Sequence, residues 1–275
     1  MVVFADKSRE AELIEIWKQS FGDSEEYIRT FFEWNLSKTM VIVYEVAGKA
    51  VSVAYLLPVM YAKAGQQPIS CWYLYAAATL PEFRGCGYFG EIMKVVREEV
   101  AEPVILVPGE ISLVAFYQKQ GLHVWLEGKN VEVILDAQNM SKWLSGRDFH
   151  VRDISGTGYA AGRNEILSKK GYIKWDKHFM EYICCENKMC GGFQKEVAVG
   201  NEKYIVLYRI EGDVLRVLEV LPQKEAERAA VETCIQVLLK ETGCLRAEVC
   251  LNPTVMATDR LKLSVNQGYF NLTMG

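Results

Sequence analysis

The stretch "LPEFRGCGYFGEIM" (residues 80–93) places three glycines, Gly85, Gly87 and Gly90, within six positions. An apolar and aromatic run, "SCWYLYAAATL" (70–80), precedes it, and a run with apolar residues at helical spacing follows it. The first run has the composition of a strand and the second has the periodicity of an amphipathic helix. The stretch therefore predicts a glycine-rich connection from a strand into a helix.

Such a connection can bind an anion. The N–H groups in the first turn of a helix have no partner inside the helix, and the helix dipole adds partial positive charge there. Glycine lets the backbone approach a phosphate closely, and Arg84 adds a cation beside the loop. The pattern alone leaves open a turn that is only structural. A P-loop is excluded, because no G-x-x-x-x-G-K-[ST] run occurs in the chain.

Composition limits the class of protein and its partners. The 275-residue chain is half hydrophobic and carries a net charge of -4, which is typical of a globular protein and gives no basic surface for nucleic acid. The most apolar segment, "VSVAYLLPVMYA" (51–62), is too short for a membrane span and contains Pro58. Charged residues begin at Asp6, so no secretory signal is expected. These features predict a cytoplasmic protein without nucleic-acid or membrane partners, and they leave its oligomeric state open.

The cysteines do not indicate a disulfide scaffold or a metal site. Eight cysteines are too few for a disulfide-built fold of this length. The cluster "CCENKMC" (184–190) lacks the spaced pair of cysteine pairs typical of zinc sites. We therefore expect reduced cysteines and no metal. A second glycine-rich stretch, "GTGYAAG" (156–162), precedes a polar run rather than an amphipathic helix, which argues against a dinucleotide loop.

The first half of the chain has the element order of a layered α/β domain. Gly22 is expected to end a first helix, and Asp23 with Glu26 is expected to form the capping box of a second. A tight turn is predicted at Gly48-Lys49. Strands are expected at 40–47, 50–62, 70–80 and 104–108, and helices at 92–100 and 112–121. Residues 122–128 and 130–135 again have strand character.

The second half repeats part of this order without a glycine loop. Five glycines between residues 146 and 171 place the boundary near residue 140, which gives domains of 1–139 and 140–275. The repeated order predicts a degenerate duplicate of the first domain. Strands are expected near 179–185, 193–199, 203–210, 213–221 and 245–251, with a helix at 223–241.

Two motifs in the first half resemble those of the GNAT N-acetyltransferase superfamily. Arg84-Gly85-Cys86-Gly87 after a strand is similar to the R/Q-x-x-G-x-G/A acetyl-CoA loop of that superfamily. The downstream stretch "AFYQKQGLHVW" (115–125) resembles its tyrosine-bearing helix that ends in glycine. The order of predicted elements up to residue 136 is similar as well. Phe89 departs from the pattern, which has Gly or Ala at that position.

This resemblance implies an α/β GNAT fold with a mixed central sheet and acetyl-CoA as the cofactor. The cofactor's pyrophosphate would bind N–H groups of the loop, and its pantetheine arm would pair with the edge of the strand that ends at Thr79. The thioester would lie in a wedge between that strand and the next, at 104–108. The implied cofactor-binding residues are Ala77, Ala78, Thr79, Arg84, Gly85, Cys86, Gly87, Tyr88, Phe89 and Gly90.

The resemblance also places a general acid on the helix after the second wedge strand, which points to Tyr117. A phenol with a pKa near 10 can protonate a thiolate of similar basicity. A core position for Tyr117 stays open as an alternative. Glu110 is the first candidate for the general base, and His123 is the second because imidazole titrates near neutral pH.

Two GNAT-like domains in tandem resemble the enhanced-intracellular-survival type of aminoglycoside N-acetyltransferase, although this chain has no room for the third domain of that type. The terminal carboxylate of those enzymes returns to the first domain's active site, which implies a role for Gly275. The first helical pair covers the acceptor site in this family, which implies Tyr27 and Trp34 in acceptor binding. Strand alternation adds Tyr73 and Tyr75 on one face of their strand.

The predicted function is transfer of an acetyl group from acetyl-CoA to a small-molecule or peptide amine, directly within a ternary complex. Two alternatives stay open: an acyl-CoA sensor without catalysis, and a tandem aminoacyl transferase of the peptidoglycan-branching type. The latter class generally does not use acetyl-CoA, so the loop at 84–90 argues against it. The sequence does not define the acceptor amine.

Overall fold

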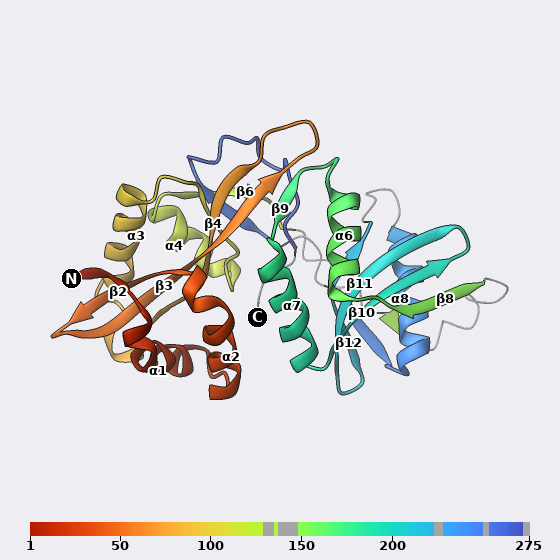
Figure 1. Ribbon diagram of the computed structural model, residues 1–275, viewed down its shortest axis with the longest axis horizontal. Helices are drawn as coiled ribbons and strands as arrows, with labels where there is room; N and C mark the ends of the chain where they lie inside the picture. Colours follow the sequence, from red (N-terminus) through yellow and green to blue (C-terminus); the bar gives the residue numbers. More distant parts are fainter. Residues whose placement is uncertain (129–134, 137–147, 223–227, 250–252, 272–275) are drawn as a thin grey trace. The chain divides into compact units, whose positions relative to one another are not determined.

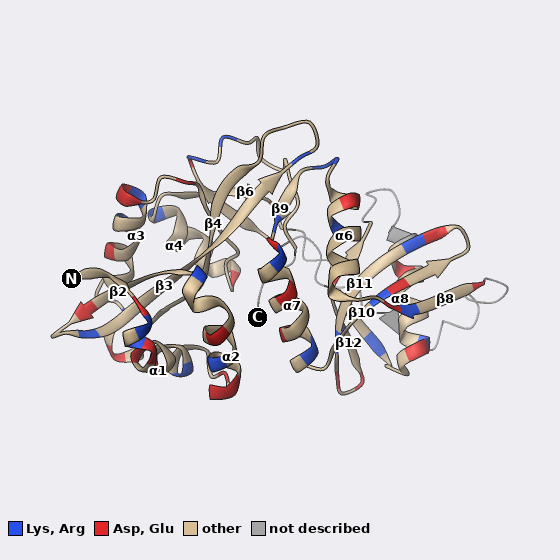
Figure 2. Cartoon of the chain, viewed as in Figure 1, with Lys and Arg blue, Asp and Glu red and all other residues tan. Residues whose placement is uncertain are grey.

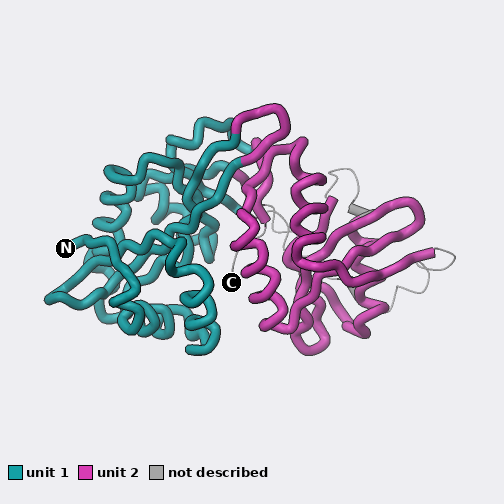
Figure 3. Tube along the Cα trace, viewed as in Figure 1, with its two compact units in different colours: residues 1–61, 68–125, 254–266 teal, residues 62–67, 126–253, 267–275 magenta. Residues whose placement is uncertain are grey.

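The computed structural model describes residues 1–128, 135–136, 148–222, 228–249 and 253–271 (Figure 1). The chain divides into two compact units (Figure 3). Unit 1 contains residues 1–61, 68–125 and 254–266, and unit 2 contains residues 62–67, 126–253 and 267–275. Each unit is built on one mixed sheet.

The sheet of unit 1 has the strand order β1-β2-β3-β4-β5-β14-β6. Only β4 and β5 pair in parallel among the strand pairs with a described register in this unit. The strands are β1 (Val2–Ala5), β2 (Met40–Val46), β3 (Lys49–Ala62), β4 (Ile69–Thr79), β5 (Val104–Leu106), β6 (Leu122–Leu126) and β14 (Val255–Thr258). The α-helices are α1 (Glu10–Phe21), α2 (Glu25–Asn35), α3 (Tyr88–Glu99) and α4 (Val114–Lys119), with 3-10 turns η1 (Lys7–Arg9), η2 (Leu36–Lys38), η3 (Pro81–Phe83) and η4 (Ile111–Leu113).

The two faces of this sheet carry different helices. Alternate residues of β3 and β4, such as Leu56 and Leu74, belong to the buried cluster that α3 and α4 cover. Their neighbours, such as Tyr55 and Tyr75, pack against Trp17 of α1 and Phe31 of α2. Because side chains alternate along a strand, both faces of the sheet are buried.

The start of α2 differs from the prediction. Gly22 ends α1 in the left-handed conformation, with a φ of 75°, as expected. Ser24, not Asp23, caps α2, and its hydroxyl accepts a hydrogen bond from the Tyr27 N–H at 3.2 Å. The Asp23 carboxylate instead accepts a hydrogen bond from the indole N–H of Trp17 at 2.8 Å. The predicted cap was wrong because the Asp23 side chain binds Trp17 of α1 and not the first-turn N–H groups of α2.

Strand β14 comes from the end of the chain and completes the sheet of unit 1. It pairs antiparallel with β5, Met256 opposite Leu106 and Ala257 opposite Ile105. The Val104 N–H also donates a hydrogen bond to the Thr258 hydroxyl at 3.1 Å. The C-terminal half of the sequence thus supplies a strand between β5 and β6, which the sequence analysis did not predict.

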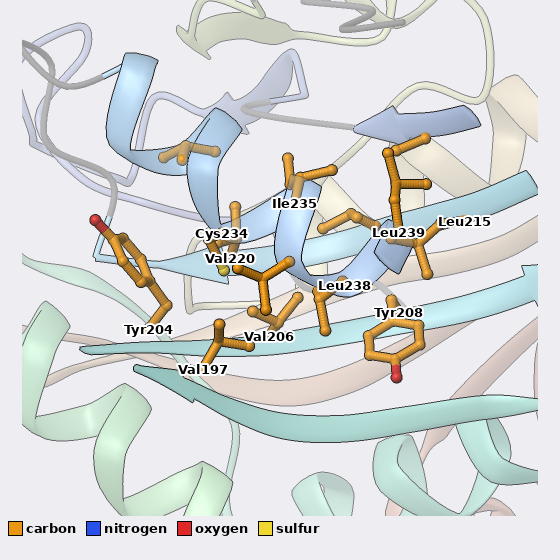
Figure 4. Close-up of a cluster of buried hydrophobic side chains, with 14 of the residues drawn as sticks. Val197, Tyr204, Val206, Tyr208, Leu215, Val220, Cys234, Ile235, Leu238 and Leu239 are labelled. Carbon is orange, nitrogen blue, oxygen red and sulfur yellow. The ribbon is translucent and has the colours of Figure 1, made fainter. Parts of the chain in front are cut away.

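The sheet of unit 2 has the strand order β7-β13-β12-β11-β10-β8, and among its described strand pairs only β12 and β13 are parallel. The strands are β7 (Leu135–Asp136), β8 (Phe149–Asp153), β10 (Gly192–Val199), β11 (Glu202–Glu211), β12 (Val214–Leu221) and β13 (Arg246–Val249), and β9 (Tyr172–Lys174) lies in the same unit. The helices are α6 (Gly156–Leu167), α7 (Lys177–Met189) and α8 (Arg228–Thr242). The apolar side chains of α8 form the core with this sheet (Figure 4), and Figure 4 labels Val197, Tyr204, Val206, Tyr208, Leu215, Val220, Cys234, Ile235, Leu238 and Leu239.

One prediction for unit 2 was wrong. Residues 179–185 are not a strand but part of α7, which Asp176 caps by accepting a hydrogen bond from the Phe179 N–H at 2.8 Å. Residues 156–162, where a dinucleotide loop was not expected, form the start of α6, which Ser155 caps. A Cβ on Gly156 would lie 3.2 Å from the Cys184 side chain, so glycine there allows α6 and α7 to pack closely.

The fold class predicted from the sequence is confirmed, because two mixed sheets with flanking helices form the two units. The predicted boundary between residues 139 and 140 lies outside the described residues and stays a prediction. The described residues at the end of the chain, 268–271, are not part of a strand. There the backbone of Tyr269 accepts from the Ile173 N–H, and the Asn271 side chain donates to the Leu218 carbonyl. No helix in the described part of the chain is long and apolar enough to cross a bilayer.

Arg260 follows β14, and its hydrogen bonds to the end of α3 predict that it stabilises unit 1. The guanidinium of Arg260 donates hydrogen bonds to the carbonyls of Val100 and Arg97, at the C-terminal end of α3. Arg260→Ala removes a cation from the negative end of the helix dipole, and we expect it to lower the free energy of unfolding by about 1 kcal/mol. Urea denaturation measures this loss. Lys262→Ala, which removes an exposed cation from the same segment, is the control, and an equal loss in both variants would contradict the assignment.

Candidate active site

The glycine-rich connection leads from β4 into α3, as predicted. Pro81 begins the short turn η3, and the chain then passes through Arg84 to the first residue of α3, Tyr88. Gly85 and Gly87 have φ angles of 79° and 80°, in the left-handed region that residues with a Cβ rarely adopt. The two glycines are therefore required by the path of the backbone.

The N–H groups of this loop face no carbonyl partner. The first backbone hydrogen bond of α3 joins the Glu91 N–H to the Gly87 carbonyl at 3.2 Å. Among the described residues, the N–H groups from residue 85 to residue 90 donate to no backbone carbonyl. Residues 84–87 are exposed, so an anion can reach these groups, and the dipole of α3 favours negative charge there.

The other predicted loop residues have distinct contacts. The Arg84 side chain donates from Nε to the Thr79 carbonyl at 3.1 Å, which braces the loop against the end of β4. Tyr88 stacks on Tyr44 with ring centroids 4.4 Å apart. The Phe89 ring points toward α4, where it packs against Phe116. The side chain at position 89 is thus turned to α4, and its N–H is one of the unpaired groups.

Strands β4 and β5 form a wedge. They pair only at Trp72 with Val104 and at Tyr73 with Ile105. Further along β4, Ala76 has a φ of 44° and the register with β3 shifts, which marks a β-bulge. The segment 77–79 pairs with β3 on one side, and within the described residues it has no register pair with β5 on the other. An extended ligand can pair with this edge, as predicted for residues 77–79.

Tyr117 of α4 lies beside the wedge. It is half-buried and packs against the cluster that contains Leu106 of β5. Burial raises the pKa of Tyr117 above its usual value of 10. Burial and the nearby Tyr117 phenol also raise the pKa of Tyr73. The Tyr117 hydroxyl is therefore protonated at neutral pH and lies within electrostatic reach of Tyr73.

The candidate bases have contacts of their own or lie outside the described residues. Glu110 is exposed at the start of η4, where its carboxylate accepts a hydrogen bond from the Ser112 hydroxyl at 3.1 Å. His123 of β6 faces the exposed carboxylate of Asp259, at 3.1 Å from Nδ1. Gly275 lies outside the described residues. The base role of each stays a prediction.

The predicted acceptor residues fall into two groups. Tyr73 and Tyr75 share one face of β4, with ring centroids 6.1 Å apart, as alternation predicted. Tyr75 packs against Trp17 at 5.6 Å, which places it under α1 and α2. Tyr27 is half-buried in the first turn of α2, and Trp34 is 36% exposed in its last turn. Their role in acceptor binding stays a prediction.

Sequence reasoning missed three contributors to the site. These are the bulge at Ala76, the contact of Phe89 with α4, and strand β14. The bulge has a weak signal in the run of three alanines after an aromatic strand. The other two depend on contacts between residues distant in sequence and have no local signal. Lys and Arg are interspersed with Asp and Glu along both units (Figure 2).

Residues 3–124 match the family model described as an acetyltransferase (GNAT) domain. The match includes both the glycine-rich loop and Tyr117. Gly85, Gly87 and Gly90 also have the spacing G-x-G-x-x-G of dinucleotide-binding loops, but the domain that contains them matches the GNAT model. A search among curated proteins gave no match.

Solved structures share the fold over nearly the whole chain. A probable N-acyltransferase of Enterococcus faecalis V583 has a TM-score of 0.68 and 13% identity, covering 97% of this chain and 73% of its own. Eis1 of Mycobacterium abscessus has a TM-score of 0.61 and 12% identity, covering 92% of this chain and 66% of its own. A tandem GNAT protein from the clavulanic acid biosynthesis pathway has a TM-score of 0.51 and 9% identity, covering 96% of this chain and 99% of its own. These similarities confirm the predicted GNAT fold and its tandem arrangement.

The loop geometry predicts a specific effect of Gly87→Val on coenzyme A binding. The added side chain would stand beside the unpaired N–H groups, and valine is strained at a φ of 80°. We expect the affinity for coenzyme A, measured by titration calorimetry, to fall about tenfold or more, the effect of losing 1.4 kcal/mol.

Gly48→Val is the matched control for this variant. Gly48 has the same φ of 80° and the same open space around its missing Cβ, but it lies in the turn between β2 and β3. Substitution of Gly48 introduces the same backbone strain outside the glycine-rich loop, so the affinity for coenzyme A should stay unchanged. Equal affinities in both variants would remove the loop from the binding site.

Proposed function

We propose, from the premise that residues 3–124 form a GNAT domain, that this protein is an N-acetyltransferase that transfers an acetyl group from acetyl-CoA to an amine. The observation that carries the proposal is the run of unpaired N–H groups at residues 85–90, next to the open edge of β4. A diphosphate with an extended arm has the chemistry to use both features.

The residues of the site fit acyl-CoA. The N–H groups of the loop would hold the pyrophosphate, with Arg84 beside them, and the edge of β4 at 77–79 would pair with the amide-bearing arm. The bulge at Ala76 and the end of the β4–β5 pairing at Tyr73 leave room in the wedge for the thioester. When bound, acyl-CoA would supply an activated acyl group.

The role of Tyr117 is to donate a proton to the departing thiolate. Its raised pKa keeps the phenol protonated at neutral pH, so it can act as an acid but not as a base there. Thiolate and phenolate have similar basicity, so this proton transfer is close to balanced.

Direct transfer to the amine is favoured over a covalent intermediate on β4. Cys71, the cysteine of that strand, is buried, and burial raises its pKa to about 11. At neutral pH it is a thiol rather than the thiolate that a nucleophile requires. We therefore propose a ternary complex, in which Glu110 or the carboxylate of Gly275 removes the proton from the amine.

The proposed acceptor is a small-molecule or peptide amine that meets the face of β4 carrying Tyr73 and Tyr75, below α1 and α2. The test is release of free thiol from acetyl-CoA across a panel of polyamines, aminoglycosides and peptides. Amine-dependent release supports the proposal. Coenzyme A binding without release for any amine would instead indicate a sensor, and absence of binding would favour an aminoacyl transferase.

Tyr117→Phe tests the proposed acid, because it removes the hydroxyl and keeps the ring. Loss of a general acid lowers the rate roughly 10²- to 10⁴-fold, so we expect this fall in kcat with little change in the KM for acetyl-CoA. On the alkaline side, the wild-type kcat should decline as the pH passes the raised pKa of Tyr117, and this decline should be absent from the variant.

Tyr61→Phe is the control for this substitution. Tyr61 is a buried tyrosine of β3 whose ring contacts Trp125 at 6.0 Å, away from the wedge. Its kcat should match that of the wild type. A kcat within about twofold of wild type in Tyr117→Phe as well would show that Tyr117 only packs.

A further inference from the structure

Three aromatic rings meet between the start of α3 and the middle of α4. The ring centroids of Phe116 and Tyr117 are 5.3 Å apart, and those of Phe89 and Phe116 are 6.0 Å apart. Phe89 meets Tyr117 edge to face, at 6.4 Å with an interplanar angle of 81°. We call Phe89, Phe116 and Tyr117 the three-ring cluster.

Phe89 is the member of this cluster that belongs to the anion-binding loop. It is the second residue of α3, and its N–H is one of the unpaired groups at 85–90. Its backbone therefore faces the proposed pyrophosphate site while its side chain contacts the proposed acid. One residue thus joins the two parts of the site.

Helices α3 and α4, which carry the cluster, are also joined near their C-terminal ends. The Arg97 guanidinium of α3 donates a hydrogen bond to the Gln120 carbonyl after α4, at 2.7 Å. A Cβ on Gly90 would lie 3.6 Å from the Gln120 side chain, so the first turn of α3 is close to the end of α4 as well. Because the helices cannot separate easily, a change at the first turn of α3 reaches the rings through packing.

Phe116, the other ring in contact with Tyr117, is 39% exposed. Phe89 is half-buried and packs with Tyr117 on the cluster that contains Leu106. An edge-to-face contact restricts rotation of the phenol, since aromatic pairs have preferred mutual angles. With a small residue at position 89, this restriction would be missing.

We propose that Phe89 is a positioning residue for Tyr117: it holds the phenol in the orientation that faces the wedge and couples anion binding on the first turn of α3 to that orientation. The inference rests on the proposed function, in which Tyr117 donates the proton. It differs from a role in cofactor binding, because the Phe89 side chain points to α4 and not to the phosphate loop.

The first experiment is a double-mutant cycle on kcat with Phe89→Ala and Tyr117→Phe. Phe89→Ala should lower kcat about tenfold, and Phe89→Tyr, which keeps the ring, should restore it. The dissociation constant for coenzyme A should stay within about threefold, because the N–H group is retained. In the Tyr117→Phe background, Phe89→Ala should cause no further loss, since its effect acts through the hydroxyl.

Additive losses of kcat in this cycle would overturn the inference, and so would a loss of affinity for coenzyme A with no loss of kcat. Either result would leave the proposed function intact. An unchanged kcat in Phe89→Ala would do the same, provided that Tyr117→Phe is impaired. If Tyr117→Phe retains full kcat, the proposed acid itself fails. Phe4→Ala, which removes an exposed phenylalanine of β1, is the control for loss of an aromatic surface residue.

The second experiment needs no turnover. The protein is labelled with 3-fluorotyrosine, and the ¹⁹F resonance of Tyr117 is identified by its absence from Tyr117→Phe. Coenzyme A should shift or sharpen this resonance in the wild type but not in Phe89→Ala, in which the ring rotates freely. The same response to coenzyme A in both proteins would overturn the coupling, whatever the outcome of the activity assays.

Discussion

Strand β5 pairs with β4 through only two residue pairs, and on its other edge it is held by β14. The hydroxyl of Thr258 adds a hydrogen bond from the first residue of β5, Val104. Because β5 is three residues long, this support from residues 255–258 fixes where it ends and where the wedge opens. Beyond that point, the segment of β4 after Tyr73 has no register pair with β5 within the described residues.

A series of hydrogen bonds extends this constraint to the helices. Arg260, two residues after β14, binds the carbonyls at the end of α3, and Arg97 of α3 binds the carbonyl of Gln120 after α4. Helix α3 presents the unpaired N–H groups at its start, and α4 carries Tyr117. The anion site and the proposed acid are therefore held by the same set of contacts, and their relative positions do not rest on loop conformation alone.

The sheet of unit 2, like that of unit 1, contains a parallel pair of strands next to a bulge. Strand β12 has a register shift at the position of Leu218, as β4 has near Ala76. The Leu218 carbonyl accepts a hydrogen bond from Asn271, and the buried carboxylate of Glu219 is bound by Arg163 and by two tyrosine hydroxyls. The residues between β12 and α8, "PQKEAE" (222–227), contain no glycine. The Glu219 carboxylate next to this bulge is bound by side chains of the same unit.

The sequence by itself determined the features that depend on local backbone chemistry. Gly85 and Gly87 have positive φ angles, a backbone requirement that is local to the loop and visible in the sequence as glycine. Alternation along the strand likewise puts Tyr73 and Tyr75 on one face. The tertiary structure alone decided which residues meet across long separations: β14 beside β5, Phe89 against Tyr117, and a helix at 177–189 where the residues resemble a strand. A short window cannot show these, because the energy of packing comes from partners that are distant in sequence.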